Sequence, residues 1–312
     1  MTLNTSMAKQ PDFIGDIHGH FDALEMLFKK MGYEKKNGIF THSERSPVFI
    51  GDYIDRGPKI LETLKLVRSM QENGSALAIM GNHEYNYLCY HLKDENDKPF
   101  RENSTKNEEQ LHETNQALNE LAERESYLSW MASLPITLET KNYRAVHAQW
   151  NDESAVALIN SGLKKFNRDG LINLYNNKAL VKEVDVLLKG LEIKLPESLY
   201  YKDHEGHERK ESRVKWWKST PGNKFSDVFA SIPEELMEKD ISAFKPDYKG
   251  FYKETEKPVF FGHYWLRPND FGLTASNACC VDFSIAKEGL LAAYRFSGEP
   301  TLNSNNLVRH ID

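Results

Sequence analysis

The sequence predicts an α/β fold built around a sheet, because strand and helix patterns alternate near its N-terminus. Three short apolar runs, each followed by or ending at a glycine, lie at 12–14, 47–50 and 76–80. Apolar residues recur at helical spacing over 21–31 and 61–70, and a third helix is expected over 83–91. A β-α-β-α-β order of this kind is typical of helices packed on a sheet.

The rest of the chain is expected to complete a single domain over 1–312. A polar, acidic stretch at 93–125 is compatible with one long helix on the rim. We interpret residues 152–256 as an insertion or cap with helices over 153–160 and 178–189. Further strands are predicted at 135–138, 143–146, 258–261, 279–283 and 290–296.

Composition narrows the class of protein. The chain has 312 residues, of which 40% are hydrophobic and 28% charged, as in a soluble globular protein. It contains neither an apolar run of the roughly 18–20 residues that span a membrane nor an N-terminal secretory pattern. Three cysteines, two of them adjacent, make no disulfide framework, so we expect a reducing, cytoplasmic location. The net charge of −6 argues against stable nucleic-acid binding.

Polar residues follow several of the predicted strands. Three blocks, GDIHG at 15–19, GDYIDRG at 51–57 and GNHE at 81–84, come directly after the first three strands. Two later strands end at His147 and His263. Ligands of α/β sheets bind at the carboxyl ends of strands, and glycine lets the backbone approach them closely.

Six of these side chains offer only oxygen and imidazole nitrogen, namely Asp16, His18, Asp52, Asn82, His147 and His263. Such a set suits manganese, iron or zinc rather than a thiolate-bound metal. Six ligands are enough for two ions if one carboxylate bridges them, and paired ions are a standard device for phosphoester hydrolysis. Asp55 and His83 then remain as a carboxylate–imidazole pair that can transfer a proton. Arg56 also remains, and its planar guanidinium can bind two oxygens of a phosphate.

These ordered blocks resemble those of the calcineurin-like metallophosphoesterases, in their phosphoprotein phosphatase branch, which includes bacterial diadenosine tetraphosphatases. The resemblance implies a four-layer α/β/β/α sandwich with two divalent ions, expected to be Mn, with Fe or Zn as alternatives. It implies a first metal on Asp16, His18 and Asp52. A second metal would be held by the bridging Asp52 together with Asn82, His147 and His263.

The resemblance also implies roles for the remaining groups. His83 would be the acid near the leaving group, Asp55 would orient it, and Arg56 would grip the phosphate. A metal-bridging hydroxide would attack phosphorus in line, without a phosphoenzyme. The stretch RVKWWK at 213–218 is similar to an RxKWW element of some bacterial members. It makes Arg213, and then Lys215, candidates for a further phosphate contact, the alternative being a solvated basic face.

Two other features have simpler interpretations. Glu84 is expected to cap the helix that begins near His83. The polar run at 202–209, with His204 and His207, fits no tight metal site and is expected to be a solvated loop.

The sequence therefore predicts a dinuclear metallophosphatase acting on phosphomonoesters of protein Ser/Thr or of small molecules. The alternatives are a symmetrical dinucleoside tetraphosphatase and an inactive metal-binding interaction module. The expected partner is a phosphorylated substrate, either a phosphoprotein or a nucleotide, and no membrane.

Overall fold

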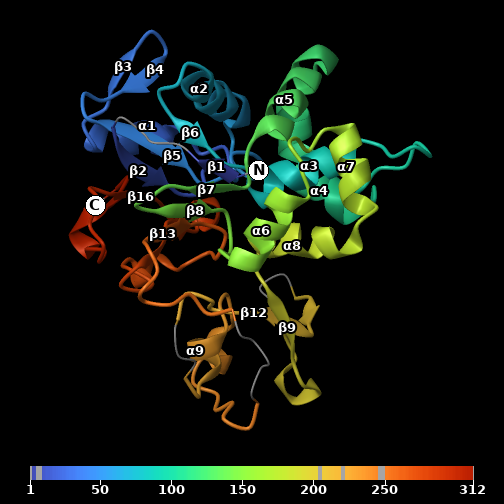
Figure 1. The fold of residues 1–312 in the computed structure, drawn as a ribbon, viewed down its shortest axis with the longest axis vertical. Helices are drawn as coiled ribbons and strands as arrows, with labels where there is room; N and C mark the ends of the chain where they lie inside the picture. Colours follow the sequence, from blue (N-terminus) through green and yellow to red (C-terminus); the bar gives the residue numbers. More distant parts are fainter. Residues whose placement is uncertain (1, 5–8, 203–205, 219–221, 245–249, 312) are drawn as a thin grey trace.

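The computed structural model describes residues 2–4, 9–202, 206–218, 222–244 and 250–311. Two β-sheets lie face to face at its centre (Figure 1). The first has the order β15-β16-β2-β5-β6, with β17 also paired to β16. Its strands are β2 Gln10–Ile14, β5 Arg45–Phe49, β6 Leu77–Ala78, β15 Asp282–Phe283, β16 Leu290–Arg295 and β17 Leu307–Arg309.

The second sheet has the order β1-β7-β8-β13-β14. Its strands are β1 Thr2–Asn4, β7 Thr137–Glu139, β8 Arg144–Val146, β13 Val259–Phe261 and β14 Ala278–Cys280. Side chains of both sheets share one apolar cluster, and Phe13 of β2 stacks on Phe260 of β13 with ring centroids 3.7 Å apart. The space between the sheets is therefore a packed core.

Helices cover the outer faces of the two sheets. Because side chains alternate along a strand, Ile14 and Phe49 point away from the inter-sheet core, and they share a cluster with Leu24 of α1 and Leu64 of α2. Figure 1 shows the other helices grouped beside the sheets. The helices are α1 Phe21–Lys30, α2 Ile60–Glu72, α3 Asn82–His91, α4 Thr105–Ala117, α5 Leu121–Ser133, α6 Asp152–Asn160, α7 Arg168–Tyr175 and α8 Lys178–Lys189. The predicted α/β sandwich is confirmed.

A lobe extends from the sheets in Figure 1. It contains β9 Glu192–Lys194, β10 Tyr201–Lys202, β11 Glu208–Arg209, β12 Glu211–Arg213 and α9 Phe225–Val228. Residues of 193–251 form an apolar cluster of their own, whereas α6–α8 pack into the main core. Trp216 and Trp217 anchor the lobe, with ring centroids 4.8 and 5.1 Å from that of Phe261. A cap spanning 152–256 stays a prediction.

Two expectations about elements were wrong, and one helix was not predicted. The stretch 279–283 is not one strand, because the chain crosses at Val281 from β14 in one sheet to β15 in the other. The long helix expected within 93–125 is two helices, α4 and α5, which pack against α2 and α3 respectively. The short helix α7 was missed, although Asn167 caps it through a bond from Gly170 N–H.

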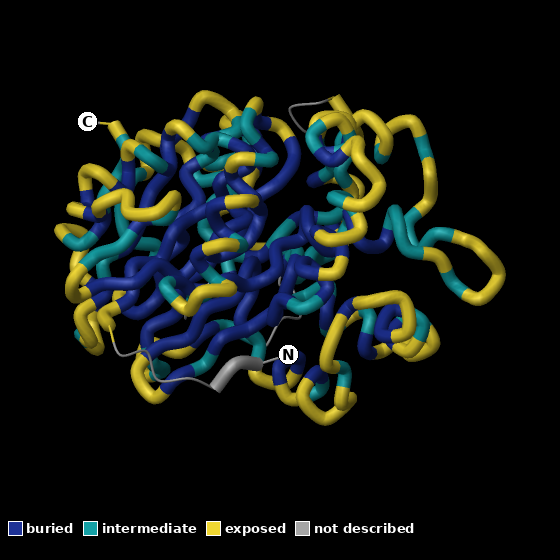
Figure 2. The backbone as a smooth tube through the Cα atoms, turned by 90° about the horizontal axis from the view of Figure 1, so that it is seen from above, coloured by how far each residue is buried: buried dark blue, intermediate teal, exposed yellow. Residues whose placement is uncertain are grey.

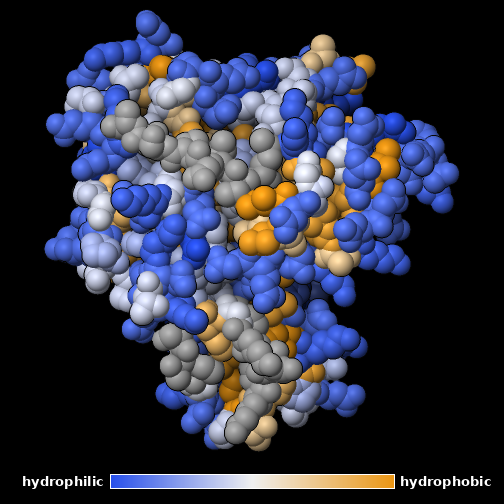
Figure 3. All heavy atoms as spheres, viewed as in Figure 1, coloured by the Kyte–Doolittle hydropathy of each residue, from blue (hydrophilic) through white to orange (hydrophobic). Residues whose placement is uncertain are grey.

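Burial follows this layered plan. Figure 2 shows buried backbone running through the sheets and exposed backbone at the turns around them. The face drawn in Figure 3 is mostly hydrophilic, and apolar atoms gather near α6, where Val156 and Ile159 are exposed.

Among the described residues, no helix is both long enough and apolar enough to cross a bilayer. The small hairpin of β3 Glu34–Lys36 and β4 Ile39–Thr41 lies at the periphery (Figure 1).

Candidate metal centre and active site

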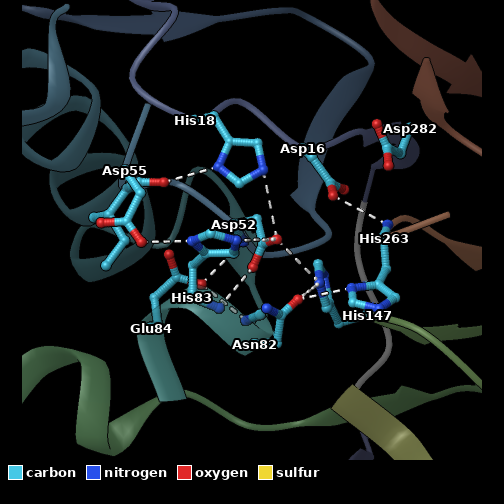
Figure 4. A network of polar contacts seen from close by, with 12 residues as sticks. Asp16, His18, Asp52, Asp55, Asn82, His83, Glu84, His147, His263 and Asp282 are labelled. Carbon is cyan, nitrogen blue, oxygen red and sulfur yellow. Dashed lines mark hydrogen bonds and ion pairs between the residues drawn. The ribbon is translucent and has the colours of Figure 1, made fainter. Parts of the chain in front are cut away.

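The polar blocks identified in the sequence meet at one edge of the two sheets. Asp16 and His18 follow β2, Asp52 to Arg56 follow β5, and Asn82 begins α3 after β6. His147 and His263 follow β8 and β13, so both sheets contribute through the ends of parallel strands. Figure 4 shows these side chains converging from separate loops.

The loops that present them have unusual backbone geometry. Positive φ angles occur at His18, Asp52, Asp55, Arg56, His263 and Trp265. Left-handed backbone is rare for residues other than glycine, and it clusters where surrounding structure forces a side chain into place. At Gly262 the constraint is space rather than a positive φ, because a Cβ there would collide with Asp16 Oδ1.

Asp52 lies at the centre of the cluster. Its Oδ2 is 3.6 Å from His18 Nε2, 3.9 Å from His83 Nε2 and 3.3 Å from His147 Nε2. Its Oδ1 accepts a bond of 3.0 Å from the His83 N–H at the start of α3. One buried carboxylate thus faces three imidazoles, as Figure 4 shows.

Two histidines are oriented toward Asp52 by the backbone. His18 Nδ1 donates to the Ile54 carbonyl and His147 Nδ1 donates to the Ile50 carbonyl, both at 2.8 Å. For His18 this bond leaves the Nε2 lone pair facing the cluster, which is how metal-binding imidazoles are commonly held. Burial alone would lower the pKa of His147, but Asp52 outweighs it and raises this pKa to about 10, so His147 has to release a proton before it can bind a metal. Asn82 Oδ1 lies 2.9 Å from His147 Nε2 and 2.7 Å from His263 Nδ1.

The donor set fits divalent ions. Two groups of close ligand atoms occur, His18–Asp52–His83 and Asp52–His147–His263, and Asp52 belongs to both. Asp16 Oδ1, His18 Nε2 and His263 Nε2 are buried without a hydrogen-bond partner in the described structure. Buried polar atoms of this kind are costly unless something binds them. Asp16 is in neither group, and its Oδ2 accepts from His263 N–H at 3.0 Å.

Burial and neighbouring charges set the protonation states. Burial, with a contribution from His83, lowers the pKa of His18 to about 3. Burial and the positive charge of Arg213 hold the pKa of His263 well below its usual range. Both imidazoles are therefore neutral, as ligands must be. Burial, reinforced by Asp282, raises the pKa of Asp16.

His83 is joined to Asp55 and through it to α4. His83 Nδ1 lies 2.5 Å from Asp55 Oδ2. The Thr114 hydroxyl donates to Asp55 Oδ1 and accepts from Asp55 N–H at 3.0 Å. The amide of Gln110 lies 3.5 Å from His83 Nδ1. Burial alone would lower the pKa of His83, but Asp52 and Asp55 outweigh it and raise this pKa.

Glu84 fixes the backbone of the same loops through hydrogen bonds to its carboxylate. It is fully buried, and its carboxylate accepts N–H bonds of 2.9, 2.9 and 2.8 Å from Gly81, Asp52 and Tyr53. The expected capping of α3 is confirmed by the bond from Gly81. The other two bonds show that Glu84 also fixes the loop that carries Asp52.

A cleft of about 1440 Å³ opens above the cluster. Asp52, Asn82, His83 and His263 form its floor, and the lobe forms its opposite wall. Arg56 lies at the mouth, with its guanidinium carbon 4.3 Å from the ring centroid of Trp265.

The two basic candidates of the lobe line this cleft. Arg213 Nε is 3.4 Å from Glu192 Oε1, and Lys215 Nζ donates to the Ser226 carbonyl at 2.7 Å. Burial, with the nearby Lys218, lowers the pKa of Lys215 to about 8. Of the run at 202–209, His207 and Arg209 also line the cleft, and His204 lies outside the described residues.

Sequence reasoning missed two residues of the site. Thr114 holds Asp55 from 59 residues away. Asp282 accepts from Trp265 N–H at 2.7 Å and from Ser284 N–H at 2.9 Å, and it raises the pKa of Asp16. The only sequence signal for Asp282 was an acid within a predicted strand, which is an unusual place for a charge.

Comparison with known proteins gives relatives for parts of the chain. An asymmetrical bis(5'-nucleosyl)-tetraphosphatase of Bacillus velezensis is 46% identical over 83 residues, which are 26% of this chain and 33% of that protein. A symmetrical bis(5'-nucleosyl)-tetraphosphatase of Vibrio parahaemolyticus is 31% identical over 148 residues, 46% of this chain and 47% of that protein. The matched segments thus span less than half the length of these relatives.

Solved structures share the fold over nearly the whole chain. A mutant cold-active protein tyrosine phosphatase superposes with a TM-score of 0.53 at 16% identity, covering 99% of this chain and 78% of that one. The cold-active protein tyrosine phosphatase of a psychrophilic Shewanella gives a TM-score of 0.50 at 15% identity, covering 97% and 82%. The family model of the calcineurin-like phosphoesterases matches residues 12–264. The chain belongs to the calcineurin-like phosphoesterases.

Proposed function

We propose that this protein is a phosphoester hydrolase that works with two divalent ions. The observation that carries the proposal is the position of Asp52, whose Oδ2 faces three imidazoles and is shared by two groups of ligand atoms. Asp16, His18 and Asp52 would hold one ion. Asp52, Asn82, His147 and His263 would hold the other. The bound ions would supply a nucleophile from water at neutral pH and neutralise phosphate oxygens.

Side chains of the protein would bind the phosphate and transfer a proton to the leaving group. Arg56 presents a planar set of N–H donors at the mouth of the cleft, which suits two oxygens of a phosphate. His83 keeps its Nδ1–H on Asp55, so a proton on Nε2 faces the cluster and can pass to a leaving alkoxide. Arg213 and Lys215, on the opposite wall, are candidates for further phosphate contacts.

Phosphomonoesters, on protein Ser/Thr or on small molecules, are the first candidate substrates, because they release an alkoxide that needs the proton the His83–Asp55 pair can supply. A symmetrical dinucleoside tetraphosphatase is the second candidate. It is supported by the partial match to a symmetrical tetraphosphatase and by a cleft large enough for a nucleotide. Manganese is our first choice of metal, with iron or zinc as alternatives.

An activity panel tests the proposal. Purified protein supplied with Mn²⁺ should hydrolyse at least one of p-nitrophenyl phosphate, a phosphoserine peptide and diadenosine tetraphosphate. Asp52→Asn should abolish turnover, because it removes the shared carboxylate. Hydrolysis that persists in this variant, or no turnover by the natural protein with Mn²⁺, Fe²⁺ or Zn²⁺, would contradict the proposal, and the latter would favour the interaction module.

A further inference from the structure

The loop that carries His263 has a strained backbone. His263 has a φ of 71° and Trp265 a φ of 52°, both in the left-handed region that residues other than glycine rarely adopt. Such angles persist only where the surrounding structure enforces them. His263 is a proposed ligand of the second ion, so the contacts that hold this loop also set the position of a metal ligand.

Two carboxylates of the core hold the ends of this loop. The N–H of His263 donates to Asp16 Oδ2 at 3.0 Å, as Figure 4 shows. The N–H of Trp265 donates to Asp282 Oδ2 at 2.7 Å. Tyr264 lies between these two anchored residues, and its contacts therefore decide how the middle of the loop is held.

The lobe holds Tyr264 through both its backbone and its ring. The Ser231 hydroxyl donates to the Tyr264 carbonyl at 2.8 Å. The Tyr264 ring is fully buried, and its centroid lies 4.7 Å from that of Trp217, which anchors the lobe. A Cβ at Gly190 would lie 2.4 Å from the Tyr264 hydroxyl, so the segment that leads into β9 lies directly against this tyrosine.

Ser231 is placed for this contact by the fold of the lobe. Ala230, which precedes it, donates its N–H to the Arg213 carbonyl at 2.9 Å. Ile232, which follows it, is buried in the apolar cluster of the lobe. Ser231 itself has a φ of 56°, which glycine would adopt more readily. The bond to Tyr264 gives a reason for a hydroxyl side chain at this position.

These contacts connect the lobe to one of the two proposed ions. If the proposed function holds, the second ion has His263 as a ligand, whereas the first ion has no ligand on this loop. We propose that Ser231 is a positioning residue for the second ion. Its bond to the Tyr264 carbonyl fixes the left-handed turn at His263 and so keeps the imidazole in place for the metal. The lobe would then support the metal centre as well as form a wall of the cleft.

Metal titration tests this role without relying on turnover. Mn²⁺ would be titrated calorimetrically into metal-free protein, and the binding step that is lost in His263→Ala defines the second ion. Ser231→Ala should raise the dissociation constant of that step by roughly tenfold, as is common when a group that orients a metal ligand is removed. The other step should change little. Ser198→Ala, at an exposed serine of the lobe that does not line the cleft, should change neither step.

A glycine variant separates the hydroxyl from backbone strain. Ser231→Gly relieves the left-handed backbone and also removes the hydroxyl, so it should retain the fold and weaken the second ion as Ser231→Ala does. Weakening in the alanine variant alone would show that strain is the cause and would overturn the proposal. An unchanged second ion in both variants, an equal weakening of both ions, or no step lost in His263→Ala would also overturn it.

The outcome for Ser231 is distinct from the outcome for the proposed function. If the second ion is weakened as expected but no phosphate compound is hydrolysed, the proposed function fails while the role of Ser231 stands. If the natural protein hydrolyses phosphate esters but both Ser231 variants bind the two ions as tightly, the role of Ser231 fails while the proposed function stands.

Discussion

His83 can act either as an acid or as a metal ligand, since its Nε2 lies 3.9 Å from Asp52 Oδ2. The short contact of its Nδ1 with Asp55 favours the acid, because that contact fixes the ring and favours the charged form. His83→Asn should therefore lower kcat by about a hundredfold or more. Bound Mn²⁺, measured by elemental analysis, should stay at the natural level.

The matched control for that experiment is His112→Asn on the exposed side of α4, which should change neither quantity. Loss of one equivalent of metal from His83→Asn would show instead that His83 is a ligand.

Thr114 is a positioning residue that acts on the reaction through Asp55 and His83. Its hydroxyl satisfies both the N–H and one oxygen of Asp55, so it fixes the carboxylate that orients His83. Thr114→Val keeps the shape and removes both bonds, and should lower kcat roughly tenfold with little change in KM. Thr114→Ser restores the hydroxyl and should recover most of the activity. If the serine variant is as slow as the valine variant, packing rather than hydrogen bonding explains the effect.

Some residues of the site could be predicted from the sequence, and others could not. Asp16, Asp52 and Asn82 could be identified because each follows a glycine at the end of an apolar strand, where polar side chains need an explanation. Thr114 and Asp282 could not, because their roles depend on partners brought to them by tertiary packing. No local pattern distinguishes such a threonine from one that merely faces the core.

At the scale of elements, strand ends were easier to predict than connections. The crossing at Val281 could not be predicted from the sequence. Two short strands in different sheets form the same apolar run as one continuous strand. The break between α4 and α5 was hidden in the same way, since Leu118 and Leu121 keep helical spacing across it. The asparagines that cap α6, α7 and α8 are, in contrast, local features of the sequence, and the one before α7 could have indicated the helix that was missed.

Glu84 joins the β5 loop to the start of α3, so its loss should weaken the junction of these elements. Glu84→Gln replaces one accepting oxygen with an NH₂ group that faces backbone donors. Leaving such donors unsatisfied costs about 1–3 kcal/mol, so the metal-free variant should unfold at lower urea concentration. Glu125→Gln, an exposed change on α5, should leave the midpoint where it is. An unshifted midpoint for Glu84→Gln would show that the loop does not depend on these bonds.

For the whole molecule, metal binding and folding should be linked, because the ligands come from loops of both sheets and converge only in the folded chain. A ligand that binds only the folded state adds about 2.7 kcal/mol at a hundredfold excess over its Kd. Mn²⁺ should therefore raise the melting temperature of the metal-free protein by several degrees in a calorimetric scan. Asp52→Asn should lose most of that rise, and Asp169→Asn, an exposed change on α7, should keep it. An equal rise in both variants would mean that Mn²⁺ binds elsewhere, because Asp52 is the residue that both groups of ligand atoms share.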